Sequence, residues 1–109
     1  MSELTVTPAI ITIATGETKY PTFNLKGTLA PGLFGTSPTS VLTDVSNLPD
    51  YPQSVDLPDD PVFLSGNRLL VQKIVGDNLT AGHVYRLDVF YNDGTGQTLS
   101  NDVGIVCPR

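Results

Sequence analysis

The segment HVYRLDVFYNDGTGQTLSNDVGIVC, residues 83–107, has the clearest structural pattern of this 109-residue chain. Alternation of apolar and polar residues places four side chains on one face of a predicted strand: Tyr85, Leu87, Val89 and Tyr91. Residues 92–96, Asn-Asp-Gly-Thr-Gly, suit the positive backbone angles of a hairpin loop. The following strand, residues 98–107, repeats the alternation with Val103, Ile105 and Cys107 on its inward face. The segment therefore predicts an antiparallel hairpin with one apolar face.

Other parts of the chain share the branched and alternating apolar residues of strands. Further strands are expected at residues 5–13, 20–26, 39–45, 68–75 and, at a sheet edge, 62–64. Phe23 and Leu25 share one face of their strand, and so do Leu70 and Ile74. No window has the periodicity of an amphipathic helix. About seven short strands at regular spacing predict an all-β, antiparallel sandwich.

Residues 46–61 interrupt this series of strands. They hold four prolines, at Pro49, Pro52, Pro58 and Pro61. Proline lacks a backbone donor and fixes its own φ, which excludes a helix or a central strand. At this length the segment is expected to be either a functional loop or a crossover between sheets.

The composition agrees with many turns and excludes several classes of protein. The chain has 10 glycines and 9 prolines, and only 16% of its residues are charged. These proportions argue against a coiled coil or a helical bundle. A net charge of −5 is too small for a disordered acidic tail. The length fits a single domain, residues 1–109, able to bury a core.

The charge distribution speaks against binding to nucleic acid, because the phosphate backbone requires clustered basic residues. The six basic side chains are instead scattered singly: Lys19, Lys26, Arg68, Lys73, Arg86 and Arg109. No apolar run is long enough for a transmembrane helix, so no membrane partner is expected. Residues 1–4 lack the basic start and apolar stretch of a signal peptide, and we expect synthesis and assembly in the cytoplasm.

Candidate nucleophiles and bases are few. His83, the single histidine, precedes a strand and is expected to be an exposed loop residue, since no motif supplies a triad around it. Cys107, the single cysteine, excludes an internal disulfide and a zinc site of several cysteines. It is expected to be a small buried apolar residue. No catalytic residue, cofactor or enzymatic activity is predicted.

Asp56, Asp59 and Asp60 gather in the proline-rich segment. Calcium prefers several oxygen ligands, and carboxylates in a loop could supply them. The spacing lacks the alternation of a calcium loop, so a solvated loop is the primary expectation and a metal the alternative.

Two groups of loop residues are candidates for an interface with another protein. Leu33 and Phe34 lie in a turn-rich stretch and either fold back into the core or form an exposed patch. Pro49, Tyr51 and Pro52 offer the same choice. Tyrosine and proline in long loops suit interfaces because they lose little side-chain entropy on binding.

Residues 79–89, LTAGHVYRLDV, resemble the tyrosine corner of immunoglobulin-like and fibronectin type III domains. In that motif a leucine, a turn with glycine and a tyrosine at the start of the next strand form one corner. The resemblance assigns these roles to Leu79, Gly82 and Tyr85. It implies an Ig-like sandwich in which the tyrosine hydroxyl bonds to backbone upstream. Antibody domains have a pair of cysteines and a tryptophan, whereas this chain has one cysteine and no tryptophan.

Residues 80–87, 95–99 and the closing strand also resemble small structural proteins of tailed bacteriophages, and residues 23–32 are similar to their opening strands. The resemblance covers about half of the chain. It implies a virion component, such as a capsid decoration (cement) protein or a neck or tail adaptor. Its partners would be the major capsid protein or neck and tail proteins, and further copies of itself in a homo-oligomer.

The residues and the resemblance together predict a non-enzymatic phage structural protein with an Ig-like fold that binds a symmetric capsid, neck or tail assembly. The alternative is a carbohydrate- or host-surface-binding module. That alternative requires exposed aromatic side chains that converge on one face, whereas Tyr20, Tyr51 and Tyr91 are dispersed along the sequence.

Overall fold

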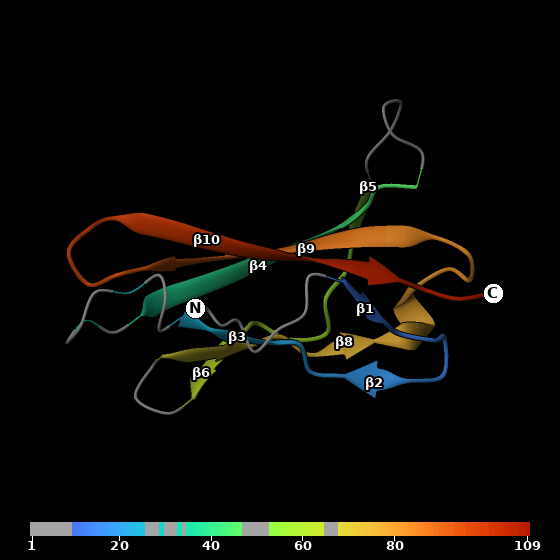
Figure 1. Ribbon diagram of the computed structural model, residues 1–109, viewed down its shortest axis with the longest axis horizontal. Helices are drawn as coiled ribbons and strands as arrows, with labels where there is room; N and C mark the ends of the chain where they lie inside the picture. The colour runs from blue at the N-terminus through green and yellow to red at the C-terminus, as the bar shows by residue number, and fades with distance from the viewer. Residues whose placement is uncertain (1–9, 26–28, 30–32, 34, 47–52, 65–67) are drawn as a thin grey trace.

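The computed structural model describes residues 10–25, 29, 33, 35–46, 53–64 and 68–109, which form two facing layers of strands (Figure 1). The larger sheet has the order β1 (Ile10–Thr12), β10 (Thr98–Val106), β9 (Val84–Asn92), β4 (Thr36–Asp44) and β5 (Gln53–Val55). Its neighbouring strands are antiparallel except β1, which runs parallel to β10. The predicted hairpin of residues 83–107 is thus the β9–β10 pair.

The opposite layer is built from shorter strands. It contains β3 (Thr22–Asn24), β7 (Leu69–Val71) and β6 (Val62–Leu64), and beside them the pair β2 (Thr18–Lys19) and β8 (Ile74–Val75). β2 leads into β3 and β7 leads into β8. Between these pairs the Gln72 backbone N–H donates to the Pro21 carbonyl at 3.1 Å. We refer to β2, β3, β6, β7 and β8 together as the small layer.

The arrangement confirms the predicted all-β sandwich. One sheet unites β9 and β10 with β4 and β5, while β3, β6 and β7 face them. The strands are more fragmented than expected, with ten segments in the described residues instead of about seven. Within the expected 20–26 strand the described residues form β3 at Thr22–Asn24, and Pro21, which has no N–H to donate, separates it from the earlier β2. The expected 68–75 strand is split at residues 72–73.

Residues 46–61 are not irregular throughout, as the prolines had suggested. β5 lies within them and pairs antiparallel with β4 between Leu42 and Asp44. The chain then passes from β5 in the larger sheet to β6 in the small layer. The segment is therefore a crossover, which was one of the two alternatives. β5 avoids every proline of the segment and lies at the sheet edge, where a short strand is compatible with prolines nearby.

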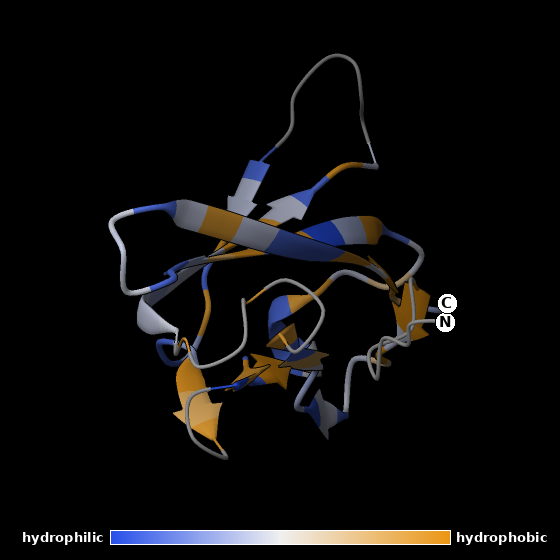
Figure 2. Ribbon diagram, turned by 60° about the vertical axis from the view of Figure 1, so that its left-hand side comes forward, coloured by the Kyte–Doolittle hydropathy of each residue, from blue (hydrophilic) through white to orange (hydrophobic). Residues whose placement is uncertain are grey.

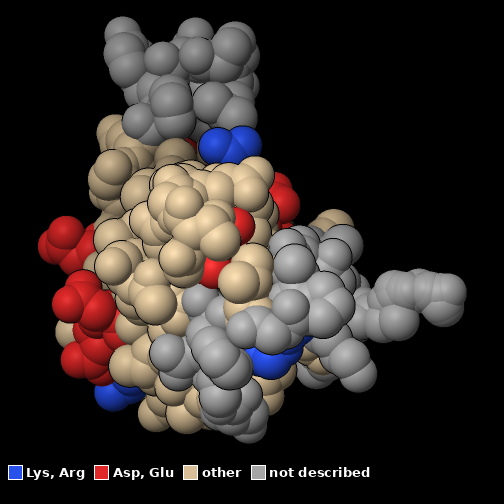
Figure 3. All heavy atoms as spheres, turned by 90° about the vertical axis from the view of Figure 1, so that its left-hand side faces the viewer, with Lys and Arg blue, Asp and Glu red and all other residues tan. Residues whose placement is uncertain are grey.

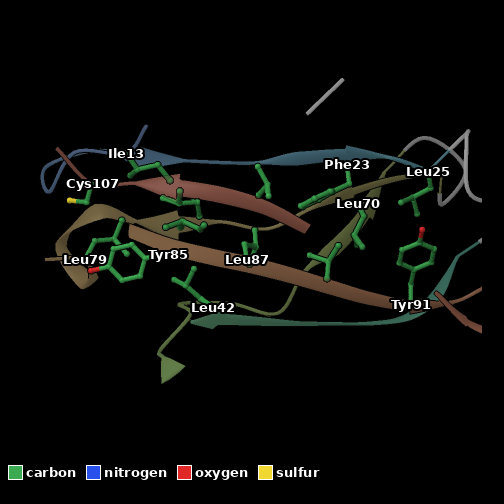
Figure 4. Packing of buried hydrophobic residues seen from close by; sticks show 14 of the residues in the cluster. Ile13, Phe23, Leu25, Leu42, Leu70, Leu79, Tyr85, Leu87, Tyr91 and Cys107 are labelled. Atoms are coloured by element: carbon green, nitrogen blue, oxygen red, sulfur yellow. The ribbon is translucent and has the colours of Figure 1, made fainter. Parts of the chain in front are cut away.

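The core lies between the layers (Figure 4). The side chains predicted to face inward on β9 and β10 are all buried: Tyr85, Leu87, Val89, Tyr91, Val103, Ile105 and Cys107. Phe23, Leu70 and Ile74 face them from the small layer and are buried as well. Each such aliphatic or aromatic side chain contributes about 1.5–3 kcal/mol when it leaves water. In the described residues no helix is long and apolar enough to cross a membrane.

The tyrosine corner residues lie together at the start of β9. The Tyr85 hydroxyl accepts a hydrogen bond of 2.6 Å from the Thr80 backbone N–H. Leu79 is buried beside it, and Gly82 has a φ of 86° that favours glycine. The Gly82 N–H donates to the Cys107 carbonyl at 2.8 Å. The corner thus joins the turn before β9 to the end of β10.

Substitution of Tyr85 by phenylalanine should destabilise the fold by about 1–3 kcal/mol, because the Thr80 N–H then loses its acceptor in a partly buried site. Urea unfolding followed by circular dichroism measures the change. The matched control is Tyr20→Phe, which removes a hydroxyl from a side chain that is 58% exposed and should leave the midpoint unchanged. Equal midpoints for the two variants would contradict this role of the corner.

Gly76 provides a second test of the fold. It is buried in the 3₁₀ turn η2 (Gly76–Asn78), and a Cβ atom there would collide with the Ala14 carbonyl oxygen. Gly76→Ala should therefore cost about 1–3 kcal/mol through overpacking. Gly16→Ala is the control, because nothing lies within 4 Å of the added methyl group. Thermal unfolding should separate the two variants, and a Gly76→Ala melting temperature as high as that of Gly16→Ala would refute the clash.

Candidate interaction surface

The outer face of the small layer exposes apolar side chains in rows. Register aligns Thr22, Val71 and Val62 across β3, β7 and β6, and it aligns Asn24, Leu69 and Leu64 in the next row. Val62 and Leu64 are 55% and 50% exposed, and Leu69 and Val71 are half-buried. We define the outer apolar face as Tyr20, Val62, Leu64, Leu69 and Val71. Apolar residues that adjoin in this way are typical of contact surfaces.

A hollow of about 520 Å³ opens on this face. It is lined by Tyr20, Asp59, Asp60, Val62, Val71 and Lys73. Its lining combines one tyrosine and two valine side chains with two carboxylates and one ammonium group. The Lys73 Nζ is 4.0 Å from Asp59 Oδ2 and both side chains are well exposed, so this ion pair is weak. The hollow therefore combines apolar contact area with an acidic border.

The strands of the larger sheet carry hydrophilic and hydrophobic residues interspersed along their length (Figure 2), and their outward side chains differ from those of the small layer. On β9, Arg86 and Asp88 point outward, and the Arg86 Nε donates to Asp88 Oδ2 at 3.0 Å. Asp102 is exposed on β10. Val41 is apolar and 43% exposed, but Asp88 is its cross-strand neighbour. Ile10 and Val84 are exposed on this sheet as well, at 63% and 39%, and Val84 pairs with Val106. The outer face of the larger sheet is thus mixed, whereas β6 and β7 place Val62, Val71, Leu64 and Leu69 in two adjoining apolar rows.

Leu33 is the one predicted interface residue that falls in the described part of the chain. It is half-buried, and its carbonyl accepts a hydrogen bond of 2.6 Å from Arg68 Nη1. Arg68 Nη2 also donates to the Leu29 carbonyl at 3.5 Å. Leu29 is buried in the core, which the sequence pattern did not indicate. The other candidates, Phe34, Pro49, Tyr51 and Pro52, lie outside the described residues.

His83 is not the isolated loop residue that its sequence position suggested. Its Nδ1 atom lies 2.7 Å from Asp44 Oδ2, and its side chain is 36% exposed. An ionised carboxylate only accepts, so Nδ1 carries the hydrogen. The Ser46 N–H donates to the other Asp44 oxygen at 2.9 Å. Asp44 ends β4 and His83 precedes β9, so the strand pairing brings together residues 39 positions apart.

These residues are the types found in a hydrolytic triad, but their bonds serve another purpose. The Ser46 hydroxyl accepts from the Val84 N–H at 2.8 Å and lies 3.3 Å from the Val84 carbonyl. It is thus engaged with backbone, and the histidine is bonded to the aspartate. The cluster fastens the end of β4 to the start of β9. It does not present an activated nucleophile.

The carboxylate of Asp44 is held in its charged form. Burial opposes that charge, but hydrogen bonds from His83 and Ser46 outweigh burial and keep the pKa of Asp44 below its ordinary value of 3.8. At Cys107 burial raises the pKa of the thiol, which agrees with a packing role for this fully buried side chain.

The acidic residues of the crossover do not assemble into a metal site. Among the residues that the structure describes, no three His, Cys, Asp or Glu side chains are grouped so that they could hold an ion. A second hollow of about 340 Å³ beside them is lined by Ser40 and residues 57–61. The Asp59 carbonyl is instead used internally, because it accepts from the buried Gln72 side chain at 3.0 Å.

No protein-family model matches this chain, and no curated protein sequence shows significant similarity to it.

The bond between Asp44 and His83 predicts that the stability of the fold depends on pH. Because the folded state lowers the pKa of Asp44, its ionised form stabilises the fold above about pH 3.8, and this contribution is lost as the pH falls through the lowered value. Asp44→Asn should therefore unfold at less urea than the wild type near pH 7. The gap should narrow below pH 3.8. The exposed Asp77→Asn is the control at pH 7 and should match the wild type. A gap that stays constant down to the acid limit would contradict the assignment.

Proposed function

We propose that this protein is a non-enzymatic structural component of a tailed-phage virion, which binds a symmetric capsid, neck or tail assembly. The outer apolar face of the small layer is the observation that carries the proposal. Val62 and Leu64 stand half exposed beside Val71 and Leu69 in adjoining rows. Apolar area gains about 25 cal/mol per Å² when it leaves water, so such a face favours contact with another protein. The virion context rests on the resemblance of residues 23–32, 80–87 and 95–99.

Many copies of one small contact would be sufficient to hold this protein on a virion. A virion displays the same partner many times around a symmetry axis or over a shell. If copies of this chain are linked to one another or to a common partner, each modest contact adds to the retention of the whole. Both a decoration protein on the capsid and an adaptor ring at the neck or tail use this principle. Further copies of the chain are compatible with either arrangement.

The described residues support a role without catalysis. Ser46 bonds to the Val84 backbone, His83 bonds to Asp44, and Cys107 is buried. These groups stabilise strand ends and the core. A carbohydrate-binding role has weaker support, because sugars stack on aromatic rings. Tyr85 and Tyr91 are buried, so Tyr20 is the one exposed tyrosine in the described part of the chain.

The test is co-sedimentation of the purified protein with heads and, separately, with tails of the phage that encodes it. Binding should be saturable, and Val62→Lys should weaken it at least tenfold, because it places a charge on the outer apolar face. The matched control is Val41→Lys. Val41 is also an exposed β-strand valine, but it lies on the larger sheet, and its substitution should leave binding unchanged.

Light scattering on the free protein then distinguishes the two virion roles. A monomer that binds heads alone indicates decoration, whereas a ring of fixed copy number that binds tails or the neck indicates an adaptor. A protein that binds neither particle, or that is retained on immobilised glycans alone, would overturn the proposal. Equal loss of binding in the two lysine variants would overturn the assignment of the face.

A further inference from the structure

The edge of the small layer at β6 is formed by a short strand of apolar residues. Within the described residues β6 pairs with β7 alone, and its other side ends the sheet. Natural edges are blunted by charges, prolines, bulges or very short strands. β6 is a short strand, Val-Phe-Leu, that follows Pro61 and has no charge, proline or bulge inside it. The edge strands β5, Gln-Ser-Val, and β1, Ile-Ile-Thr, also carry no charge or proline, but of these three edge strands β6 is the one that lines the acidic hollow.

The surroundings of β6 are acidic. Asp59 and Asp60 come shortly before the strand and line the hollow next to Val62. Asp56 is exposed earlier in the crossover, directly after β5. Lys73 is the one cation among the residues that line the hollow, and it is already directed at Asp59. In Figure 3 acidic side chains are most prominent along one side of the molecule, with others elsewhere on the visible face. The whole chain carries a charge of −5.

We propose that β6 accepts an extended segment of another protein as an added antiparallel strand. The segment places apolar side chains beside Val62 and Leu64 and places lysine or arginine beside Asp59 and Asp60. This inference deepens the proposed function, which supplies the biological setting of the partner. Its test uses synthetic peptides and no phage particle, so the two can fail separately.

For an antiparallel partner, the position of the acidic residues determines which end of the segment is basic. An added strand would extend the rows that end at Val62 and Leu64, with cross-strand Cβ distances of about 4.5–5.5 Å. Backbone hydrogen bonds provide part of the affinity, and alternate side chains provide the specificity. The acidic residues precede β6, so they lie at the strand's N-terminal end. An antiparallel partner would therefore bring its C-terminal end to Asp59 and Asp60.

Charge favours such a partner over a second copy of this chain. A copy that docked through its own β6 would bring another uncharged Val-Phe-Leu strand and a further net charge of −5. It would supply no cation from that strand to Asp59 or Asp60. A basic segment would satisfy the carboxylates and would be drawn toward the acidic surface before contact.

The experiment uses a soluble peptide of alternating valine and threonine that ends in two C-terminal lysines, with binding measured by fluorescence anisotropy. Three matched peptides provide the comparison. One has glutamate in place of lysine, one has both lysines at the N-terminal end, and one is N-methylated at alternate backbone positions. Each should bind at least tenfold more weakly than the first peptide. N-methylation leaves the side chains in place and removes the donors needed for strand pairing, so it tests strand addition itself.

Variants of the protein test the other side of the contact. Asp59→Asn combined with Asp60→Asn should weaken binding of the lysine peptide about tenfold and reduce its dependence on salt. The control combines Asp77→Asn with Asp102→Asn, which removes the same charge from exposed positions outside the hollow. NMR shift changes on peptide binding should centre on residues 62–64 and their partners in β7.

Three results would overturn the proposal: no binding of the lysine peptide at millimolar concentration, equal binding of the N-methylated or glutamate peptide, or an equal effect of the two double variants. A stable dimer of the free protein that Val62→Lys dissolves would assign the edge to a second copy instead. Binding of phage particles without binding of the peptide would leave the proposed function intact and refute this inference alone.

Discussion

Burial of one face of β9 is the constraint on which the rest of the structure depends. β9 lies inside the larger sheet, between β10 and β4, and Tyr85, Leu87, Val89 and Tyr91 all point into the core. This row needs a cover of comparable length. The fragments of the small layer supply it with Phe23, Leu70 and Ile74. The Tyr85 hydroxyl also anchors the turn before β9. A core residue of this strand therefore fixes the position of the turn that leads into it.

The sandwich distributes its polar groups unevenly, and this asymmetry underlies the proposed role. The larger sheet presents Arg86, Asp88 and Asp102 to solvent, together with the apolar Val41 and Val84. The small layer presents Val62 and Leu64 on β6, which in the described residues pairs with β7 alone. A protein that acts alone in water has little reason to place apolar rows there. A protein that is one part of an assembly can keep its solubility through one face and bind through the other.

The sequence pattern was sufficient to predict a strand where consecutive side chains alternate between the core and the solvent. It predicted the β9–β10 hairpin, the shared faces of Phe23 with Leu25 and of Leu70 with Ile74, and β6 as residues 62–64. It did not predict β5, because four nearby prolines obscured a strand held by its pairing with β4. It also missed the bond of His83 to Asp44, since nothing in a sequence marks two residues that meet through strand register.

The sequence by itself determined the fold class, because alternation, turn residues and β-branched side chains act locally and exclude helices over every window. It also determined which residues of β9 and β10 face inward. The tertiary structure alone decided that Tyr20, Val62 and Val71 share one hollow with Asp59 and Asp60. That grouping joins the end of β2, the crossover, β6 and β7. It depends on which strands become neighbours, which is set by the packing of the two layers and not by any single segment.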